Sequence, residues 1–301
     1  MTLDSGATID QGFTERLIQV RASIEQRLNE LLPECGNERD LVAVAMREST
    51  LAPGKRMRPI LLLLAAQGLG HDGPQGLELG CAVEMIHAAS LVLDDMPCMD
   101  NAALRRGRPT VHLKFGEDVA ILTAVALLSR AFGVIASIQD LPPAIRTQLV
   151  EIAANAVGMQ GLVRGQFQDL RDGQQARSPE EIAMTNNLKT GALFGAIMDM
   201  AWLIGSSDET VRPGLQNFAM ELGQAFQMYD DLRDKHFDGD KDTGKDLGKS
   251  TFVSLYGEDK VRQQLQVHLG NAQECLRQVY GDSHLITGYM RMVFDKAALA
   301  V

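Results

Sequence analysis

The sequence predicts an all-α protein that forms a single-domain helical bundle, and three observations predict it. Long stretches rich in Ala, Leu, Met and Gln repeat their apolar residues at helical spacing. No run of useful length alternates apolar and polar residues as a half-buried strand does. Several of the expected helices, residues 121–138 among them, are apolar on most faces, which is typical of helices inside a bundle.

Breaker residues divide the chain into its expected elements. Pro53-Gly54, residues 71–74, Pro142-Pro143, residues 205–208 and the glycine-rich stretch 239–248 interrupt the helical periodicity. No internal repeat, linker or change in composition marks a second domain, so residues 1–301 are expected to form one domain, with about residues 1–12 flexible. The expected helices are 13–32, 41–52, 58–68, 75–96, 119–138, 143–172, 179–204, 210–234 and 260–279, followed by a short C-terminal helix.

Composition and net charge exclude some classes of binding partner for this protein. Apolar residues make up 45% of the 301 residues and charged residues 23%, which is ordinary for a globular chain with a sizeable core. A formal charge of -10 argues against a nucleic acid or an anionic membrane surface as partner. The longest apolar run, residues 60–66, is far shorter than the roughly 20 residues of a membrane span. No nucleic-acid partner and no membrane span are therefore expected.

The N-terminus and the cysteines predict the cellular location. The opening MTLDSGATID has neither the basic nor the apolar segment of a secretory signal. The cysteines lie far apart, with no C-x-x-C pair and no histidine at zinc spacing, which is typical of reduced thiols. They are Cys35, Cys81, Cys98 and Cys275. A soluble cytoplasmic protein is therefore expected.

Two aspartate clusters are the strongest functional signal. The first, Asp94, Asp95 and Asp100, follows a nearly uncharged helix. In the second, Gln227, Asp230, Asp231 and Asp234 stand at i, i+3, i+4 and i+7 and share one helix face. Either cluster alone could be a solvated acidic face. Carboxylates crowded in this way repel one another unless cations bind, and such oxygen ligands suit Mg²⁺ that is shared with substrate phosphates.

Pro97 stands between the aspartates of the first cluster. On a straight helix Asp100 would point well away from Asp94, but proline cannot continue the hydrogen-bond ladder. The sequence therefore predicts that the helix is interrupted within residues 95–99 and that Asp100 returns toward Asp94. A straight helix through Asp100 would contradict this prediction.

Short basic motifs bounded by Gly or Pro accompany the aspartates. Lys55 and Arg58, in GKRMRP, stand at a helix start, where backbone N–H groups favour an anion, and the two cations can converge on one diphosphate. In an acidic chain, basic residues confined in this way indicate small-anion sites. The other motifs are Arg105-Arg106, Lys189-Thr190 and the group Lys241, Lys245 and Lys249. His87 shares the helix face of Asp94; a lone histidine there is commonly a core residue, but a ligand role is favoured here.

These residues resemble the polyprenyl synthetase family of trans-prenyltransferases, and the resemblance covers nearly the whole chain from about Phe13. The segment 91–116, LVLDDMPCMDNAALRRGRPTVHLKFG, is similar to the geranylgeranyl diphosphate synthases of bacterial carotenoid pathways. The first aspartate cluster corresponds to the family's first motif in its longer bacterial form, and the second cluster corresponds to the second motif. The resemblance implies an isoprenoid synthase bundle with a central apolar cavity.

The resemblance also implies which residues bind the two substrates. Lys55, Arg58, His87 and Arg106 would bind isopentenyl diphosphate. The allylic substrate would be dimethylallyl, geranyl or farnesyl diphosphate, bound through Arg105, Lys189, Gln227 and Lys241, with Lys249 as a further candidate. Asp240 stands before Lys241 where the family usually has Gly, so the roles of Lys241, Lys245 and Lys249 stay open. Gln166 and Asp169 fit the family's Gln-x-x-Asp pattern near the second pocket.

Magnesium chemistry at the aspartates follows from the same resemblance. Three Mg²⁺ ions would neutralise the diphosphate as the allylic C–O bond breaks. Lys189 and Thr190 would assist, with the Thr190 carbonyl near the nascent cation. The departing diphosphate is the expected proton acceptor, and a homodimer is expected because most family members are homodimers. The implied metal ligands are Asp94, Asp95, Asp100, Asp230, Asp231 and Asp234.

Small residues below the first cluster predict the product. Ala89 and Ser90 stand five and four positions before Asp94, and at about 1.5 Å per residue Ala89 lies roughly 7 Å down the helix. Family enzymes that stop at fifteen carbons tend to carry an aromatic there, so the resemblance implies a geranylgeranyl diphosphate synthase. Farnesyl or longer products remain the alternative. A class I terpene cyclase is disfavoured by the second DDxxD and the GKRMRP motif, and a non-catalytic subunit by the intact aspartates.

Overall fold

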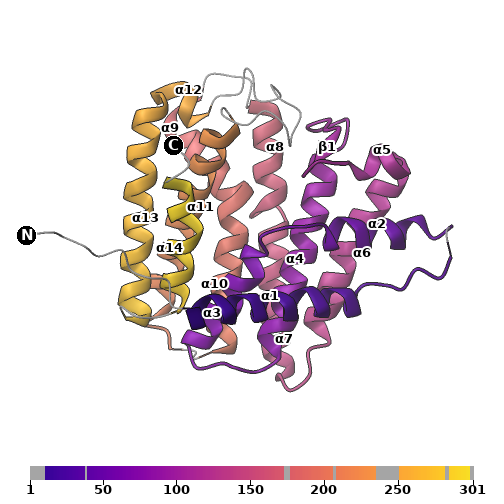
Figure 1. Ribbon diagram of the computed structural model, residues 1–301, viewed down its shortest axis with the longest axis horizontal. Helices are drawn as coiled ribbons and strands as arrows, with labels where there is room; N and C mark the ends of the chain where they lie inside the picture. Colours follow the sequence, from indigo (N-terminus) through magenta and orange to yellow (C-terminus); the bar gives the residue numbers. More distant parts are fainter. Residues whose placement is uncertain are drawn as a thin grey trace, which may run out of the picture.

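Two nearly uncharged helices, α4 (Gln75–Asp94) and α10 (Ala192–Ile204), form the centre of the protein. The computed structural model describes residues 11–37, 39–172, 177–205, 208–234, 251–281 and 285–298. Within them the chain forms an all-α bundle, as predicted, with long helices side by side (Figure 1). Most side chains of α4 and α10 are buried because neighbouring helices cover nearly every face.

The N-terminal half of the chain packs around α4. The helices α1 (Gln11–Leu31), α2 (Leu41–Leu51) and α3 (Met57–Gly68) contact it from one side, and α6 (Glu117–Ala136) runs beside it. The Asp40 carboxylate caps α2 by accepting a hydrogen bond from the Ala43 N–H. The short α5 (Val111–Phe115) precedes α6.

The other helices of the C-terminal half are α7 (Pro143–Val157), α8 (Leu162–Asp172), α9 (Pro179–Asn186), the π-helical turn η1 (Asn187–Gly191), α11 (Arg212–Asp234), α12 (Phe252–Tyr256), α13 (Glu258–Tyr280) and α14 (Leu285–Ala298). Of these, α7 and α11 pack on α10, and α13 packs on α11. Buried apolar side chains from Leu17 to Phe294 belong to one contiguous cluster. The single domain itself stays a prediction, and residues 1–10 of the expected flexible terminus lie outside the described residues.

The predicted helix over residues 143–172 is wrong, because the chain breaks into α7 and α8 at residues 158–161. A Cβ on Gly161 would lie 2.1 Å from the carbonyl oxygen of Ala156, so the chain turns more tightly there than any side chain permits. Isolated glycines within helical periodicity do not reveal such a turn, because a helix also tolerates them.

A two-stranded hairpin was not predicted from the sequence. The strands β1 (Leu104–Arg105) and β2 (Arg108–Pro109) pair antiparallel, with Arg105 opposite Arg108. The two turn residues, Arg106 and Gly107, both have positive φ, 54° and 73°, as a type I′ turn requires. The strands are too short to show alternation, which explains why the sequence pattern missed them.

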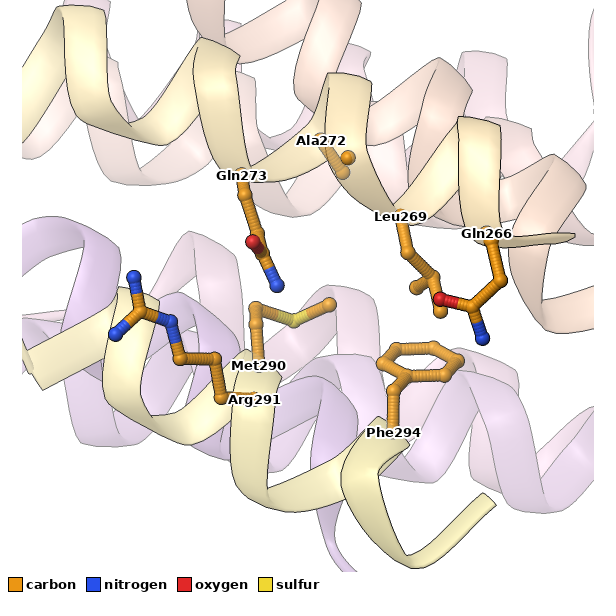
Figure 2. A pocket seen from close by; sticks show the side chains of 8 residues that line it. Gln266, Leu269, Ala272, Gln273, Met290, Arg291 and Phe294 are labelled. Atoms are coloured by element: carbon orange, nitrogen blue, oxygen red, sulfur yellow. The ribbon is translucent and has the colours of Figure 1, made fainter. Parts of the chain in front are cut away.

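A small cleft separates α13 from α14. It has a volume of about 140 Å³, and in Figure 2 the side chains of Met290 and Phe294 point from α14 toward Leu269 of α13. On its other side, the ring of Phe294 packs edge-on against Tyr229 of α11, with 6.2 Å between the ring centroids. This ring contact links α14 to α11.

Two helices are long and apolar enough, by length and composition alone, to cross a membrane. They are α4 and α6, although 67% and 44% of their apolar windows are buried inside the protein. Core helices of globular proteins have the same length and composition. The expected absence of a membrane span therefore stays a prediction.

Candidate functional site

The first aspartate cluster lies where α4 ends. The helix ends at Asp94, and the chain then turns back, so that the Asp100 N–H donates to the Asp94 carbonyl at 2.9 Å and the Ala102 N–H to the Asp95 carbonyl at 3.1 Å. The predicted interruption before Asp100 is therefore confirmed, as is its return toward Asp94. Pro97 lies within this turn.

Charge is concentrated at this turn. Burial raises the pKa of Asp94 to about 6; the carboxylates of Asp100 and Asp95 add to the shift, and Lys189 and Arg105 oppose it. The pKa of Asp95 is also raised, mainly by burial. Carboxylates held in this way are destabilising unless a cation joins them.

The hairpin brings two arginines to the site from adjacent positions. Arg105 Nε donates to the two carboxylate oxygens of Asp95 at 3.0 and 3.2 Å. Arg106 Nη1 donates to the carbonyl oxygen of Pro53 at 2.8 Å. The hairpin therefore connects the first aspartate cluster to the loop that precedes α3. In Figure 1 it stands at the same end of the bundle as α8.

Lys189 supplies positive charge from η1. Its Nζ donates to Asp169 Oδ2 on α8 at 2.8 Å. Burial acts to lower the pKa of Lys189, but the carboxylates of Asp169, Asp94 and Asp100 outweigh it and raise that pKa. Lys189 is therefore a partly buried, charged ammonium shared between α8 and the first aspartate cluster.

Glycines allow neighbouring helices to approach η1 closely. A Cβ on Gly165 of α8 would lie 2.4 Å from the backbone nitrogen of Lys189, and one on Gly223 of α11 would lie 2.9 Å from the Cα of Gly191. One regular helix was expected over residues 179–204, so the π turn was not predicted from the sequence. Single π turns occur frequently at functional sites, where they alter the direction of a side chain.

The second aspartate cluster lies on α11, facing the start of α3. Gln227 Nε2 donates to Asp231 Oδ1 at 2.8 Å. Asp230 is close enough to Arg58 to favour its charged form against the effect of burial. The Lys55 ammonium lies over the Tyr229 ring, 5.8 Å from its centroid. Asp234 is in the last turn of α11, but its side chain lies outside the described residues, as do Lys241, Lys245 and Lys249.

Arg58 and His87 meet between the two clusters. Arg58 Nη1 lies 3.3 Å from His87 Nε2. Burial lowers the pKa of His87 well below its ordinary value, and the charges of Arg58 and Arg106 lower it further. The imidazole is therefore neutral, and because a guanidinium can only donate, Nε2 accepts from Arg58.

These contacts connect the elements that carry the two aspartate clusters. The helix α4 carries His87 and Asp94, and Lys189 of η1 lies beside Asp94. The turn η1 meets α11, which carries Asp230. Arg58 of α3 lies near Asp230 and contacts His87, which returns to α4. The two aspartate clusters therefore share a single site with two separate groups of cations.

Comparison with known proteins shows the family of this chain. Residues 39–282 match the polyprenyl synthetase family. The geranylgeranyl diphosphate synthase of Pantoea ananas is 53% identical over 287 residues, 94% of each chain. The chain belongs to the polyprenyl synthetase family. The geranylgeranyl diphosphate synthase of Pseudescherichia vulneris is 50% identical over 277 residues, 91% of this chain and 90% of that protein.

Solved structures share the fold of this polyprenyl synthetase. The geranyltransferase of Helicobacter pylori, complexed with magnesium and isoprenyl diphosphate, matches it with a TM-score of 0.84 at 26% identity. The match covers 100% of both chains. The family and its helical fold were both expected from the sequence, and both are shown.

The carboxylate groups at this site are suited to an open magnesium site rather than to a preformed site in which protein ligands surround the metal. Among the described residues, no three His, Cys, Asp or Glu side chains converge as a preformed cage. Mg²⁺ is characteristically bound through one or two carboxylates, waters and substrate phosphates, so a half-built site with raised aspartate pKa values suits it. Asp94, Asp95, Asp100, Asp230 and Asp231 are the described residues that could hold it.

Arg177 also belongs to this site and was not predicted from the sequence. Its side chain is 7% exposed, with Nη2 4.0 Å from Asp169 Oδ1, and Nη1 donates to Thr185 Oγ1 at 3.3 Å. Arg177 therefore adds a second cation beside the Asp169 carboxylate that holds Lys189. It stands directly before Ser178, which caps α9 in a capping box with Glu181. Nothing in that local pattern marks Arg177 as a site residue.

Three remaining candidates occupy different surroundings. Gln166 of α8 directs its amide toward the Met99 sulfur at 3.9 Å, so α8 reaches the turn of the first cluster. Ala89 is fully buried in α4. The Ser90 hydroxyl donates to the His87 carbonyl at 2.9 Å, which satisfies it within its own helix. The proposed role of Ala89 and Ser90 in chain length therefore stays a prediction.

Proposed function

We propose that this polyprenyl synthetase is a geranylgeranyl diphosphate synthase, which ionises an allylic diphosphate and joins it to isopentenyl diphosphate. The observation that carries the proposal is the presence of two groups of cations beside the two aspartate clusters. One group surrounds Arg58 and His87, and the other contains Lys189 and Arg105. Two such groups suit two diphosphate substrates, because each diphosphate needs its own charged donors.

The two aspartate clusters would hold three Mg²⁺ ions, whose positive charge would stabilise the departing diphosphate. Lys189 and Arg105 orient that diphosphate, and Gln227 and Lys241 or Lys249 complete its binding site. The Thr190 carbonyl oxygen stabilises the allylic cation. The buried apolar side chains around the site exclude the water that would otherwise quench that cation.

The second substrate binds at the start of α3. Lys55, Arg58 and Arg106 donate to the diphosphate of isopentenyl diphosphate, and neutral His87 orients Arg58. The substrate double bond then attacks the cation, and the diphosphate released earlier accepts the proton. Proximity, rather than a general base on the protein, carries this step.

The twenty-carbon product is supported by the small residues Ala89 and Ser90. It is also supported by the names of the relatives from Pantoea ananas and Pseudescherichia vulneris. The test is incubation of the purified protein with isopentenyl diphosphate, Mg²⁺ and each allylic starter in turn, followed by chromatographic sizing of the products. A fifteen-carbon end product, or one longer than twenty carbons, would replace the product assignment, and no turnover with any starter would overturn the proposed activity.

We also propose that two copies of the chain pair through α6. Three large apolar side chains on one stretch of this helix are about half exposed: Ile121 at 49%, Leu122 at 54% and Val125 at 56%. A protein of this size rarely leaves such a stripe in water. Light scattering should give twice the chain mass for the parent protein and a lower mass for Leu122→Lys. A parent protein of single-chain mass would contradict the pairing.

A further inference from the structure

Arg56 has an unusual backbone and a buried side chain within the GKRMRP loop. Its φ is 51°, in the left-handed region that non-glycine residues rarely adopt. Its Nη1 donates to Glu84 Oε1 on α4 at 2.9 Å, and its Nη2 donates to the carbonyl oxygen of Ala52 at 2.9 Å. The side chains of Arg56 and Glu84 are only 3% and 7% exposed. The Glu25 carboxylate of α1 lies 3.7 Å from Arg56 Nε.

The left-handed backbone of Arg56 and the burial of its charged side chain each cost folding free energy. A left-handed conformation at a residue with a side chain costs about 1–3 kcal/mol, and it persists only where the surroundings hold it. Burial of an ion pair is weak evidence for net stability, because desolvation offsets the attraction between the charges. A strained residue and a buried pair on one loop therefore indicate a role in geometry.

At Arg56, where the backbone φ is positive, the side chains of the loop take different directions. Arg56 points toward Glu84 and α1, whereas its neighbours point toward the site. Lys55 lies over the Tyr229 ring, and Arg58 contacts His87 and lies over the Phe194 ring, 5.1 Å from its centroid. Arg56 is thus held on Glu84 of α4, while Lys55 before it and Arg58 after it reach the aromatic rings of α11 and α10.

Glu84 ties this loop to the helix that carries the rest of the pocket. It stands three residues before His87 on α4, so the two side chains share a helix face. Its charge also favours the charged forms of Arg58 and Arg106, the two arginines nearest to the pocket. One buried carboxylate therefore fixes the loop and acts on the arginines around it.

We propose that Arg56 is a positioning residue for the isopentenyl diphosphate pocket, where its buried ion pair with Glu84 sets the directions of Lys55 and Arg58 against His87. This inference rests on the proposed function of that pocket. Arg56 does not contact the substrate; it acts through its two neighbours. Loss of the pair therefore weakens the binding of isopentenyl diphosphate and leaves the allylic substrate unaffected.

The experiment measures KM for each substrate separately in Arg56→Gln, Glu84→Gln and the double variant. Arg56→Gln should raise KM for isopentenyl diphosphate by about tenfold or more, because small displacements of binding groups have large effects. KM for the allylic diphosphate should stay within about twofold of the parent value. The double variant should lose less than the product of the two single effects, because the two residues act as one pair.

Arg27→Gln is the matched control. Arg27 also joins α1 to α4, through Glu78 at 2.7 Å, but this pair is partly exposed and lies outside the pocket. It should leave both KM values unchanged. If Arg56→Gln does not fold, the isosteric Glu84→Gln decides the question by the same comparison of KM values.

Three results would overturn the inference: an unchanged KM for isopentenyl diphosphate, a parallel rise in both KM values, or the same change in Arg27→Gln. Absence of turnover in the parent protein is a different outcome, since it removes the proposed function itself. Turnover by the parent with no separation of the two KM values removes only the role of Arg56.

Discussion

Asp94→Asn is expected to stabilise the metal-free protein while it abolishes activity. Burial raises the pKa of Asp94 to about 6 in the folded chain, from an ordinary value of 3.8. The folded state therefore binds a proton at this carboxyl more tightly than the unfolded state does. For an acid with a raised pKa, stability is fully present at low pH and is lost as the pH rises through the interval from about 4 to 6.

The magnitude follows from the size of this shift. A difference of about 2 pKa units corresponds to about 3 kcal/mol at 1.36 kcal/mol per unit. Asparagine keeps the size of the side chain and removes the charge. Asp94→Asn should therefore raise the free energy of unfolding by up to about 3 kcal/mol at pH 8, by about half as much at pH 5, and by nothing below about pH 4.

The assay is denaturant unfolding of both proteins in the presence of a chelator, at pH 4, 5 and 8. Asp208→Asn is the control of opposite sign, because hydrogen bonds from Thr210 lower the pKa of Asp208 and its charge is favourable. A variant no more stable than the parent at pH 8 would refute the reasoning, as would a gain that does not depend on pH. Added Mg²⁺ should stabilise the parent more than the variant, because the variant lacks one ligand.

Three further predictions test other parts of the site. Gly165→Ala should lower the free energy of unfolding by about 1–3 kcal/mol in thermal or denaturant unfolding, because the new Cβ would lie 2.4 Å from the backbone nitrogen of Lys189. Gly270→Ala is the control: nothing lies within 4 Å of its Cβ, so it should be neutral or slightly stabilising. Lys189→Met should raise KM for the allylic diphosphate by about tenfold or more in initial-rate measurements, with a smaller effect on isopentenyl diphosphate. Ala89→Phe should shorten the product on chromatography, whereas Phe at the exposed Ala22 should not, and an unchanged product length would refute the position of the pocket floor.

Much of the helical framework could be predicted, because long helices carry their own signal. Periodicity over ten or more residues, together with breakers such as Pro53 and Pro142, located most helices of the described chain to within a few residues. The turn after Asp94 was also predictable, because Pro97 has a local and unavoidable effect on the backbone.

Features that depend on contacts between distant segments were not predictable. The π turn at Lys189 reflects the approach of α8 and α11, and no residue within η1 reveals it. The pairing of Arg56 with Glu84 joins positions 28 residues apart, and one chain alone offers no sign of it. The aspartates and basic motifs could be found because such closely spaced charged residues are rare. Residues that orient them, such as Arg56 and Glu84, resemble ordinary surface charges in the sequence.

The π turn also bears on how this region tolerates length changes. A turn closed by i to i+5 hydrogen bonds holds one more residue than the α-turn that it replaces, so α9 and α10 are out of phase by about 100°. Deletion of a single residue at Thr190 would restore a continuous α-helix and rotate every side chain on one side of it. A designer who transplants this lysine into another bundle must therefore transplant the extra residue as well.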